Sequence, residues 1–401
     1  MRLNFLSLLI ALPLALLSGV VGCRSQDEPK LGIPKDLSII GTRWDATPRS
    51  SATVLISGHS LTDPLPDPLV AIAHSLGTTI EWNRQSVPGS SVRVRTRGLD
   101  ESQGVWAGYR TGFNRDSENM DVLAELRSPR TINARKYDVL LITEQHGLLG
   151  TLVWNDTVRY LRHFHDRFIE ANPSGSTYFY EPWISISDKS DPRKWITYER
   201  AASPIWQCIA TRVNVALAHE GRTDRIVTIP AGLALAELVN RATTGAGLLD
   251  VSRGSVRETM DALISDDVHV STLGGYFVSL VTYSSIYRRS PVGAGAPESV
   301  KLSTARALQE FAWDFVSRYY SSYQPLSLEE CRERVVRQFN SAYWAYEHEI
   351  GFARDDGALQ AFAKVVRLRF QWKQRFGTLD SSNPLYFDAA TNHQYWLLGP
   401  E

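Results

Sequence analysis

The stretch TVLISGHSLTD, residues 53–63, decides the fold of this chain. Its first half is a β-branched and leucine-rich run typical of a buried strand, and Ser-Gly-His-Ser ends that run before Leu-Thr-Asp-Pro begins a helix. The serine of such a turn, Ser60, exposes its hydroxyl and directs its backbone N–H outward. This position suits a nucleophile whose own amide helps to bind an oxyanion.

Strand-like and helix-like segments alternate along the chain that follows. The third strand-like run is almost wholly apolar, as a parallel strand buried on both faces should be. The alternation predicts an α/β fold with a doubly wound parallel sheet of about five strands, with Ser60 just past the first. The expected strands are 53–57, 78–83, 137–143, 176–183 and 225–231, and the expected helices are 67–77, 116–127, 155–171, 199–219 and 231–242.

A second stretch, DDVHVSTLGGYF at residues 266–277, supplies the partners that a nucleophilic serine needs. A neutral hydroxyl requires a base to take its proton, and a carboxylate usually orients that base. Asp266 and His269 converge if their loop runs into a helix, which we expect at 273–287 behind a Ser-Thr cap. The prediction is a catalytic Ser60–His269–Asp266 triad, with Asp267 as the competing carboxylate.

Together these motifs resemble those of the SGNH (GDSL-like) hydrolases. Gly58-His59-Ser60-Leu61 stands where that family has Gly-Asp-Ser-Leu. The last block of the family, Asp-x-x-His followed by a helix with glycine and an aromatic, is matched by Asp266, His269, Gly274 and Tyr276. The resemblance covers roughly residues 50–290 and implies a three-layer α/β/α sandwich with a flavodoxin-like sheet.

The resemblance also implies which groups hold the oxyanion. The family uses the N–H of the nucleophilic serine, here Ser60, and that of a glycine in its second block, for which Gly89 of SVPGSS is the candidate. Its third donor is an asparagine in a Gly-x-Asn-Asp block, but this chain has TEQHG at 143–147. Gln145 is the predicted replacement through its amide, and the ring of His146 is the alternative. A further departure is His59, which replaces the usual Asp beside the nucleophile.

The N-terminus predicts export. Arg2 precedes an apolar run at 5–21, which is too short for a typical transmembrane helix and is typical of a secretory signal. Val-Val-Gly-Cys, ending at Cys23, resembles a bacterial lipobox and implies cleavage before Cys23 and lipidation of its thiol. Arg24, rather than Asp, favours the outer membrane, facing the periplasm or the exterior. An ordinary signal peptide with an incidental cysteine is the alternative.

The composition changes along the chain predict four parts. The polar residues after the signal are a tether, and the wholly helical pattern after about residue 299 is a C-terminal extension whose aromatics pack its helices. The connection from 90 to 135 is long, and we expect its Trp106, Tyr109 and Phe113 to overhang the site. The parts are a lipoprotein signal peptide at 1–22, a tether at 23–50, an SGNH-like domain at 51–298 and the helical extension at 299–401.

Two cysteines besides Cys23 would enter an oxidising compartment after export. We therefore predict a disulfide between Cys208 and Cys331, with two buried thiols as the alternative. The 43 basic and 43 acidic residues balance, which argues against nucleic acid as a partner because phosphate binding needs a concentrated basic surface.

Other polar residues allow two interpretations each. Arg93, Arg95 and Arg97 have period-two spacing, which predicts one side of an extended segment, either a solvated strand face or a contact for an anionic substrate. His163 and His165 are expected on the surface of an amphipathic helix rather than at a metal. Glu181 and Trp183 stand at the end of the strand expected at 176–183, and they either line the pocket or pack behind it.

The predicted function is an exported, lipid-anchored serine esterase that removes acyl groups, with acetyl as the expected group, from an envelope or extracellular carbohydrate. No metal and no cofactor are expected. The expected partners are an acylated carbohydrate or another small ester and, through the lipid anchor, a membrane. The alternatives are an O-acetyltransferase acting on an envelope polysaccharide, and a non-catalytic envelope binding protein, which the altered third block favours.

Overall fold

A computed structural model describes most of the chain from residue 48 onward. The predicted signal peptide, the lipidation site Cys23 and nearly all of the tether lie outside the described residues. The described residues are 48–99, 105–130, 132–133, 135–245, 247–248, 250–352 and 357–396.

The centre of the fold is a five-stranded sheet in which every pairing is parallel, in the order β2-β1-β3-β4-β5. The middle strands are buried from both faces, as their apolar sequences require. The predicted α/β class and the five parallel strands are confirmed. The strands are β1 at Ser51–Gly58, β2 at Thr79–Ser86, β3 at Val139–Thr143, β4 at Ser176–Tyr180 and β5 at Ile226–Ile229.

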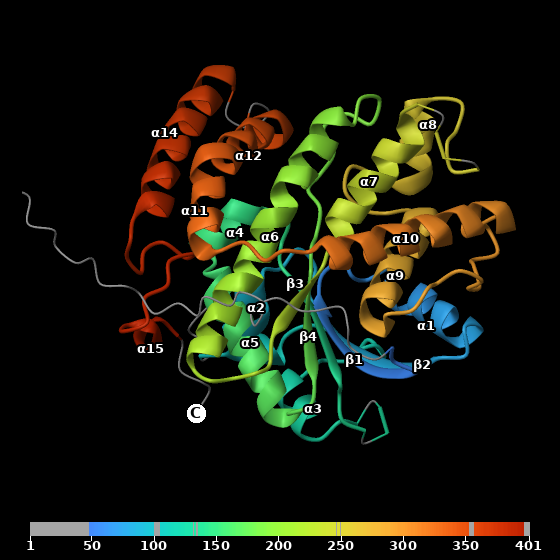
Figure 1. Cartoon of the computed structure of the whole chain (residues 1–401), viewed down its shortest axis with the longest axis horizontal. Helices are drawn as coiled ribbons and strands as arrows, with labels where there is room; N and C mark the ends of the chain where they lie inside the picture. Colours follow the sequence, from blue (N-terminus) through green and yellow to red (C-terminus); the bar gives the residue numbers. More distant parts are fainter. Residues whose placement is uncertain are drawn as a thin grey trace, which may run out of the picture. The chain divides into compact units, whose positions relative to one another are not determined.

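Helices cover both faces of the sheet (Figure 1). Helices α1 and α9 pack together on one side, and α5 and α6 pack together on the other. The helices of the α/β part are α1 at Pro66–Ser75, α2 at Val92–Thr96, η3 at Ala107–Arg110, α3 at Val122–Arg127, α4 at Leu148–Trp154, α5 at Thr157–Ala171, α6 at Arg193–His219, α7 at Ala231–Thr243, α8 at Val256–Leu263 and α9 at Thr272–Tyr287.

The C-terminal quarter is helical, as expected from its sequence. Its elements are α10 at Leu302–Ser322, α11 at Leu328–Arg334, η4 at Val335–Phe339, α12 at Asn340–Glu347, η5 at His348–Phe352, α14 at Ala358–Gly377 and α15 at Asn392–Tyr395. Helix α10 packs on α9, and α11 and α12 pack on α6. Within the described part of the chain, no helix has both the length and the apolar character needed to cross a membrane.

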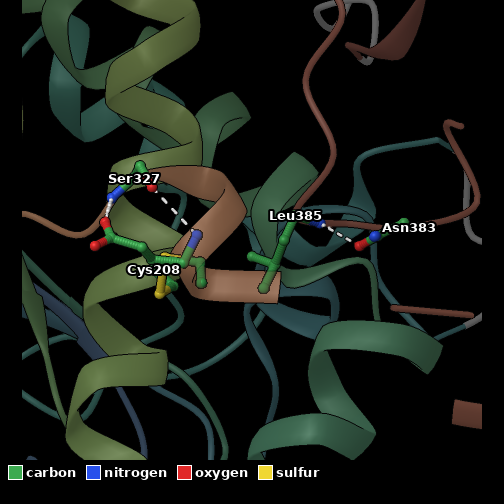
Figure 2. Close-up of a disulfide and its surroundings, with 6 residues drawn as sticks. Cys208, Ser327, Asn383 and Leu385 are labelled. Atoms are coloured by element: carbon green, nitrogen blue, oxygen red, sulfur yellow. Dashed lines mark hydrogen bonds between the residues drawn. A yellow bond between two sulfur atoms is a disulfide. The ribbon is translucent and has the colours of Figure 1, made fainter. Parts of the chain in front are cut away.

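A disulfide joins the C-terminal helices to the α/β part. It links Cys208 of α6 to Cys331 of α11, with the two Cα atoms 5.8 Å apart (Figure 2). Helix α11 begins beside it with a capping box, in which Ser327 accepts from the N–H of Glu330 and the Glu330 carboxylate accepts from the N–H of Ser327. A covalent bond and a capped helix therefore fix the first turn of α11 against α6.

The outer edge of the sheet is occupied by side chains. The side-chain amide of Asn214 on α6 bonds both the N–H and the carbonyl of Ile226, at 2.8 and 2.9 Å. The hydroxyl of Tyr320 on α10 donates to the carbonyl of Thr228 at 2.9 Å. Strand β5 is thus bonded on its free side by residues from the helices around it.

The connection between β2 and β3 differs from the expectation. Trp106 stacks on the ring of His163 in α5, with centroids 3.7 Å apart, and the hydroxyl of Tyr109 lies 2.8 Å from Nδ1 of His163. Both aromatics belong to the core rather than overhanging the site, while Phe113 is about half exposed. The expectation that His163 and His165 lie on a helix surface is also wrong, because both are buried.

The extended segment predicted for the arginine run is wrong as well. The hydroxyl of Ser91 accepts from the N–H of Val94 and begins the short helix α2, which carries Arg93 and Arg95. Arg95 is fully buried, so the run is not a solvated strand face. The predicted helix at 116–127 is shorter, since Asp121 caps it and the helix spans only Val122–Arg127.

Candidate active site

The structure brings together the three residues of the predicted triad from opposite ends of the α/β part. The hydroxyl of Ser60 lies 2.9 Å from Nε2 of His269, and Nδ1 of the same ring lies 2.7 Å from a carboxylate oxygen of Asp266. The Ser60 turn follows β1, and the other two residues stand in the loop before α9. This order of hydroxyl, imidazole and carboxylate can move a proton off the serine as the oxygen attacks a carbonyl.

The loop that carries His269 is fixed by its own backbone. The second carboxylate oxygen of Asp266 accepts from the N–H groups of Val268 and His269, at 2.8 and 2.7 Å. The indole of Trp183 donates to the carbonyl of Val268 at 2.6 Å, so Trp183 packs behind this loop. The hydroxyl of Ser271, two residues after His269, caps α9, as the sequence predicted.

Asp266 is held in its ionised form. Partial burial opposes ionisation, but the N–H groups of His269 and Val268 and the His269 ring outweigh it and lower the pKa of Asp266 to about 2. Asp267, the competing carboxylate, has no hydrogen bond to His269 among the described residues; its backbone carbonyl accepts from the N–H of Ile186. The geometry therefore makes Asp266 the carboxylate that orients the histidine.

The turn around Ser60 depends on a close approach. A Cβ on Gly58 would lie 1.9 Å from the hydroxyl oxygen of Thr62, so only glycine fits there. The N–H groups of Thr62 and Asp63 both donate to the carbonyl of His59, forming a tight turn. Helix α1 begins only at Pro66, so a turn separates Ser60 from the helix that the sequence placed directly after it.

Two of the predicted oxyanion donors have free backbone N–H groups. Neither the N–H of Ser60 nor that of Gly89 has a hydrogen-bond acceptor among the described residues. Gly89 follows β2 in the left-handed conformation, with φ of +63°, which favours glycine. Unpaired N–H groups beside a nucleophile are the usual components of an oxyanion hole.

The residues after β3 have two different roles: Glu144 holds neighbouring segments together, and Gln145 and His146 lie in the loop beside the triad. Glu144 is fully buried, and its carboxylate accepts from the N–H groups of Val92 and Gln145 and from the hydroxyl of Thr157. The side chain of Gln145 is half-buried and makes no hydrogen bond among the described residues. His146 is half-buried in the structure; burial lowers its pKa, and its charge would interact with those of Asp267 and His269. Both candidates for the third donor therefore belong to the loop beside the triad.

His59 connects the serine turn to this loop. The N–H of Leu61 points at its Nδ1 at 3.4 Å, which leaves Nε2 as the donor to the carbonyl of Glu144 at 3.0 Å. Burial and the nearby charge of Arg95 lower the pKa of His59 to about 3, so the ring is neutral. The His59 ring thus bonds the turn after β1 directly to the residues that follow β3.

A buried arginine beneath the site was missed from the sequence. Arg95 donates to the hydroxyl of Ser57 at 3.0 Å and to the carbonyl and hydroxyl of Ser90, at 2.7 and 2.8 Å. It also donates to the carbonyl of Thr143. Burial lowers the pKa of Arg95 to about 10, and the charge of Glu144 opposes that shift. One guanidinium therefore bonds β1, the Gly89 loop and the end of β3.

Two acidic residues behind the loop are buried too. Burial raises the pKa of Glu181 well above its usual value, and it raises that of Glu199 to about 8. Glu199 accepts from the N–H of Ile184 at 2.7 Å. Glu181 and Trp183 pack behind the site, which is the second of their two interpretations.

The triad is open to solvent and has a polar pocket at its side. The side chains of His269 and Asp266 are 43% and 54% exposed. A pocket of about 400 Å³ adjoins Asp266, and Ile186 is the one apolar residue among those lining it. The charged residues lining it are Asp188, Lys189, Arg257, Asp261, Asp266 and Asp267.

Comparison with known proteins yields two similar solved structures. No family model matches the chain, and no curated protein matches its sequence. A DUF4886 family protein from Bacteroides uniformis is 14% identical with a TM-score of 0.46; the match covers 69% of this chain and 98% of that one. A protein from Parabacteroides merdae described as a "putative GDSL-like lipase" is 15% identical with a TM-score of 0.33, and the match covers 60% and 98%.

Proposed function

We propose that the protein is a serine ester hydrolase with Ser60 as nucleophile, His269 as base and Asp266 as the residue that orients the base. The observation that carries the proposal is the continuous pair of contacts from Ser60 through His269 to Asp266, at 2.9 and 2.7 Å. The free N–H groups of Ser60 and Gly89 support it. The Gln145 amide is the proposed third oxyanion donor.

The reaction has two steps. Nε2 of His269 takes the proton of the Ser60 hydroxyl as its oxygen attacks the ester carbonyl, and the N–H donors hold the oxyanion of the tetrahedral intermediate. Collapse of the intermediate transfers the proton from His269 to the departing alcohol and leaves an acyl-serine. Water then attacks the acyl-serine and gives a proton to His269; collapse of the second tetrahedral intermediate returns that proton to the Ser60 oxygen and releases the acid.

The substrate we propose is a carbohydrate carrying short acyl groups, with acetyl first. The exposed triad can receive a side group of a polymer, and the charged pocket beside Asp266 suits hydroxyl-rich substrate rather than a long alkyl chain. We also propose that the protein is exported and lipidated at Cys23. The disulfide between Cys208 and Cys331 supports an oxidising compartment.

The test is hydrolysis of p-nitrophenyl acetate, with labelling by a fluorophosphonate, in the wild type, Ser60→Ala and the matched surface variant Ser381→Ala. We expect the wild type and Ser381→Ala to hydrolyse the ester and to carry the label on the Ser60 peptide, and Ser60→Ala to do neither. A wild type that neither hydrolyses the ester nor binds the reagent contradicts the proposal and favours a binding protein.

A second experiment identifies the substrate and the acceptor. Acetylated glycans are incubated with the enzyme, with and without a deacetylated glycan as acceptor. Free acetate as the main product supports the esterase, whereas acetyl transfer to the added glycan would make the protein an O-acetyltransferase. Faster cleavage of long-chain esters than of acetylated glycans would contradict the carbohydrate substrate.

A further inference from the structure

Helix α14 presents two apolar faces, only one of which is covered. Its inner face packs against the C-terminal helices through Ala361, Val365, Leu368, Trp372 and Phe376, which are buried. The outer face carries four large apolar side chains that are 49–86% exposed. They are Leu359, Phe362, Val366 and Phe370, the α14 stripe.

The spacing of the α14 stripe places its members on one line along the helix. They follow one another at intervals of three or four residues, so their side chains lie above one another on the same face. Figure 1 shows α14 beside α12, which accounts for its inner contacts. Four exposed large apolar residues in one line differ from the scattered apolar residues of ordinary surfaces and indicate a binding surface.

The charge of α14 indicates what the stripe contacts. The helix has five basic residues and no acidic one. Arg367 and Arg369 are exposed on either side of the stripe, and Lys373 is exposed near its end. A helix with an apolar stripe and flanking arginines and lysines is the form that lies on membranes containing anionic lipids.

A groove lies beside the α14 stripe, between α14 and η4. It has a volume of about 550 Å³, and its apolar lining comes from Val336, Val366 and Phe370. Its basic lining comes from Arg337, Arg369 and Lys373; of these, Arg337 pairs with Glu333 at 3.2 Å. Apolar and basic groups side by side match the two parts of an anionic lipid, its acyl chain and its headgroup.

We propose that α14 docks on a membrane surface containing anionic phospholipid, with the α14 stripe in the lipid and the flanking basic residues at the headgroups. A second copy of the chain is a poorer occupant, because a symmetric contact through α14 would bring the basic residues of both copies together. The proposal is independent of the esterase activity and of lipid attachment at Cys23.

The test uses the full chain with Cys23→Ser, which removes lipidation and leaves no thiol outside the Cys208–Cys331 disulfide. An environment-sensitive fluorophore is attached at Phe370→Cys, or at Leu302→Cys on α10 as the matched control, since Leu302 is 86% exposed. Vesicles contain phosphatidylcholine alone or with about 30% phosphatidylglycerol. We expect a blue shift at position 370 with the anionic vesicles and none at 302.

The charges are tested by the pair Arg367→Gln and Arg369→Gln against the pair Arg306→Gln and Arg318→Gln on α10, which removes the same charge. Each basic residue at the surface contributes about fivefold to binding, so the α14 pair should weaken binding by about 25-fold and the α10 pair much less.

Three results would overturn the proposal. One is an unshifted fluorophore at 370 with anionic vesicles, and another is equal weakening by both charge pairs. The third is a blue shift at 370 that appears without vesicles, either as protein concentration rises or on adding another protein, because it would assign the stripe to a protein partner. Urea unfolding with the same midpoint as the parent protein shows that each variant is folded.

Discussion

Nε2 of His59 donates to the carbonyl oxygen of Glu144 at 3.0 Å, joining the serine turn to the loop after β3. The ring must be neutral for its Nδ1 to face the N–H of Leu61 at 3.4 Å. A buried neutral histidine makes the site sensitive to acid, since protonation would put a charge next to buried Arg95.

His59 predicts a specific dependence of stability on pH. Its pKa falls from 6.5 in the unfolded chain to about 3 in the folded protein, so between these values the unfolded chain binds one more proton. The contribution of His59 is complete above pH 6.5 and falls by about 1.4 kcal/mol per unit as the pH drops toward 3. Urea unfolding at several pH values should show a shallower slope in His59→Gln, and equal slopes would contradict the neutral ring.

The two neighbouring aspartates should differ sharply in their effect on catalysis. Asp266→Asn should lower kcat by about 10³–10⁴-fold, because an amide leaves the His269 ring free to adopt the tautomer that cannot accept the Ser60 proton. Asp267→Asn, the matched variant, should leave kcat near that of the wild type, since its side chain makes no hydrogen bond to His269 among the described residues. Ester hydrolysis by both variants decides the assignment, and the reverse order would make Asp267 the orienting residue.

Arg95 and Glu144 should be coupled in stability. Each is fully buried, and the charge of each favours the ionised form of the other, so removing one leaves the other buried without that favourable interaction. We therefore expect Arg95→Met and Glu144→Gln to be strongly destabilised, and the double variant to lose clearly less than the sum of the two. Urea unfolding of the four proteins measures the coupling, and additive losses would show that the two charges act separately.

Loss of the disulfide should destabilise the whole fold. The bond between Cys208 and Cys331 closes a loop of 123 positions, which is worth about 4–5 kcal/mol in the chain-entropy model. The double variant Cys208→Ala/Cys331→Ala should have a correspondingly lower free energy of unfolding. Urea unfolding of the oxidised wild type and of this variant measures the difference in free energy of unfolding, and Cys23→Ala serves as the control. Equal stabilities of the wild type and the double variant would contradict the expectation.

The fold was predictable because its signals are local. The apolar run before Gly58 and the run at 139–143 have the composition of strands buried on both faces, and helices follow each. The convergence of Asp266 and His269 was predictable for the same reason, since three residues and a capped helix determine it.

The rest depends on contacts between distant residues. Helix α2 has five residues, too few for a helical period to be seen, so its arginines looked like a strand. The bonds of Arg95 to Ser57 and Thr143, and the stacking of Trp106 on His163, depend on the packing of the whole domain. Glu144, a carboxylate directly after a buried strand, was the one signal in the sequence of a buried polar network.

The side chains of Asn214 and Tyr320 along strand β5 have a consequence for how the protein can be divided. An open strand edge pairs readily with the edge of another molecule, which leads to aggregates. Any shortened form that ends before α10 loses Tyr320 and leaves the carbonyl of Thr228 available to such a neighbour. The C-terminal helices therefore help to protect this edge of the sheet from such pairing, and a fragment ending near residue 298 should precipitate by strand-to-strand association.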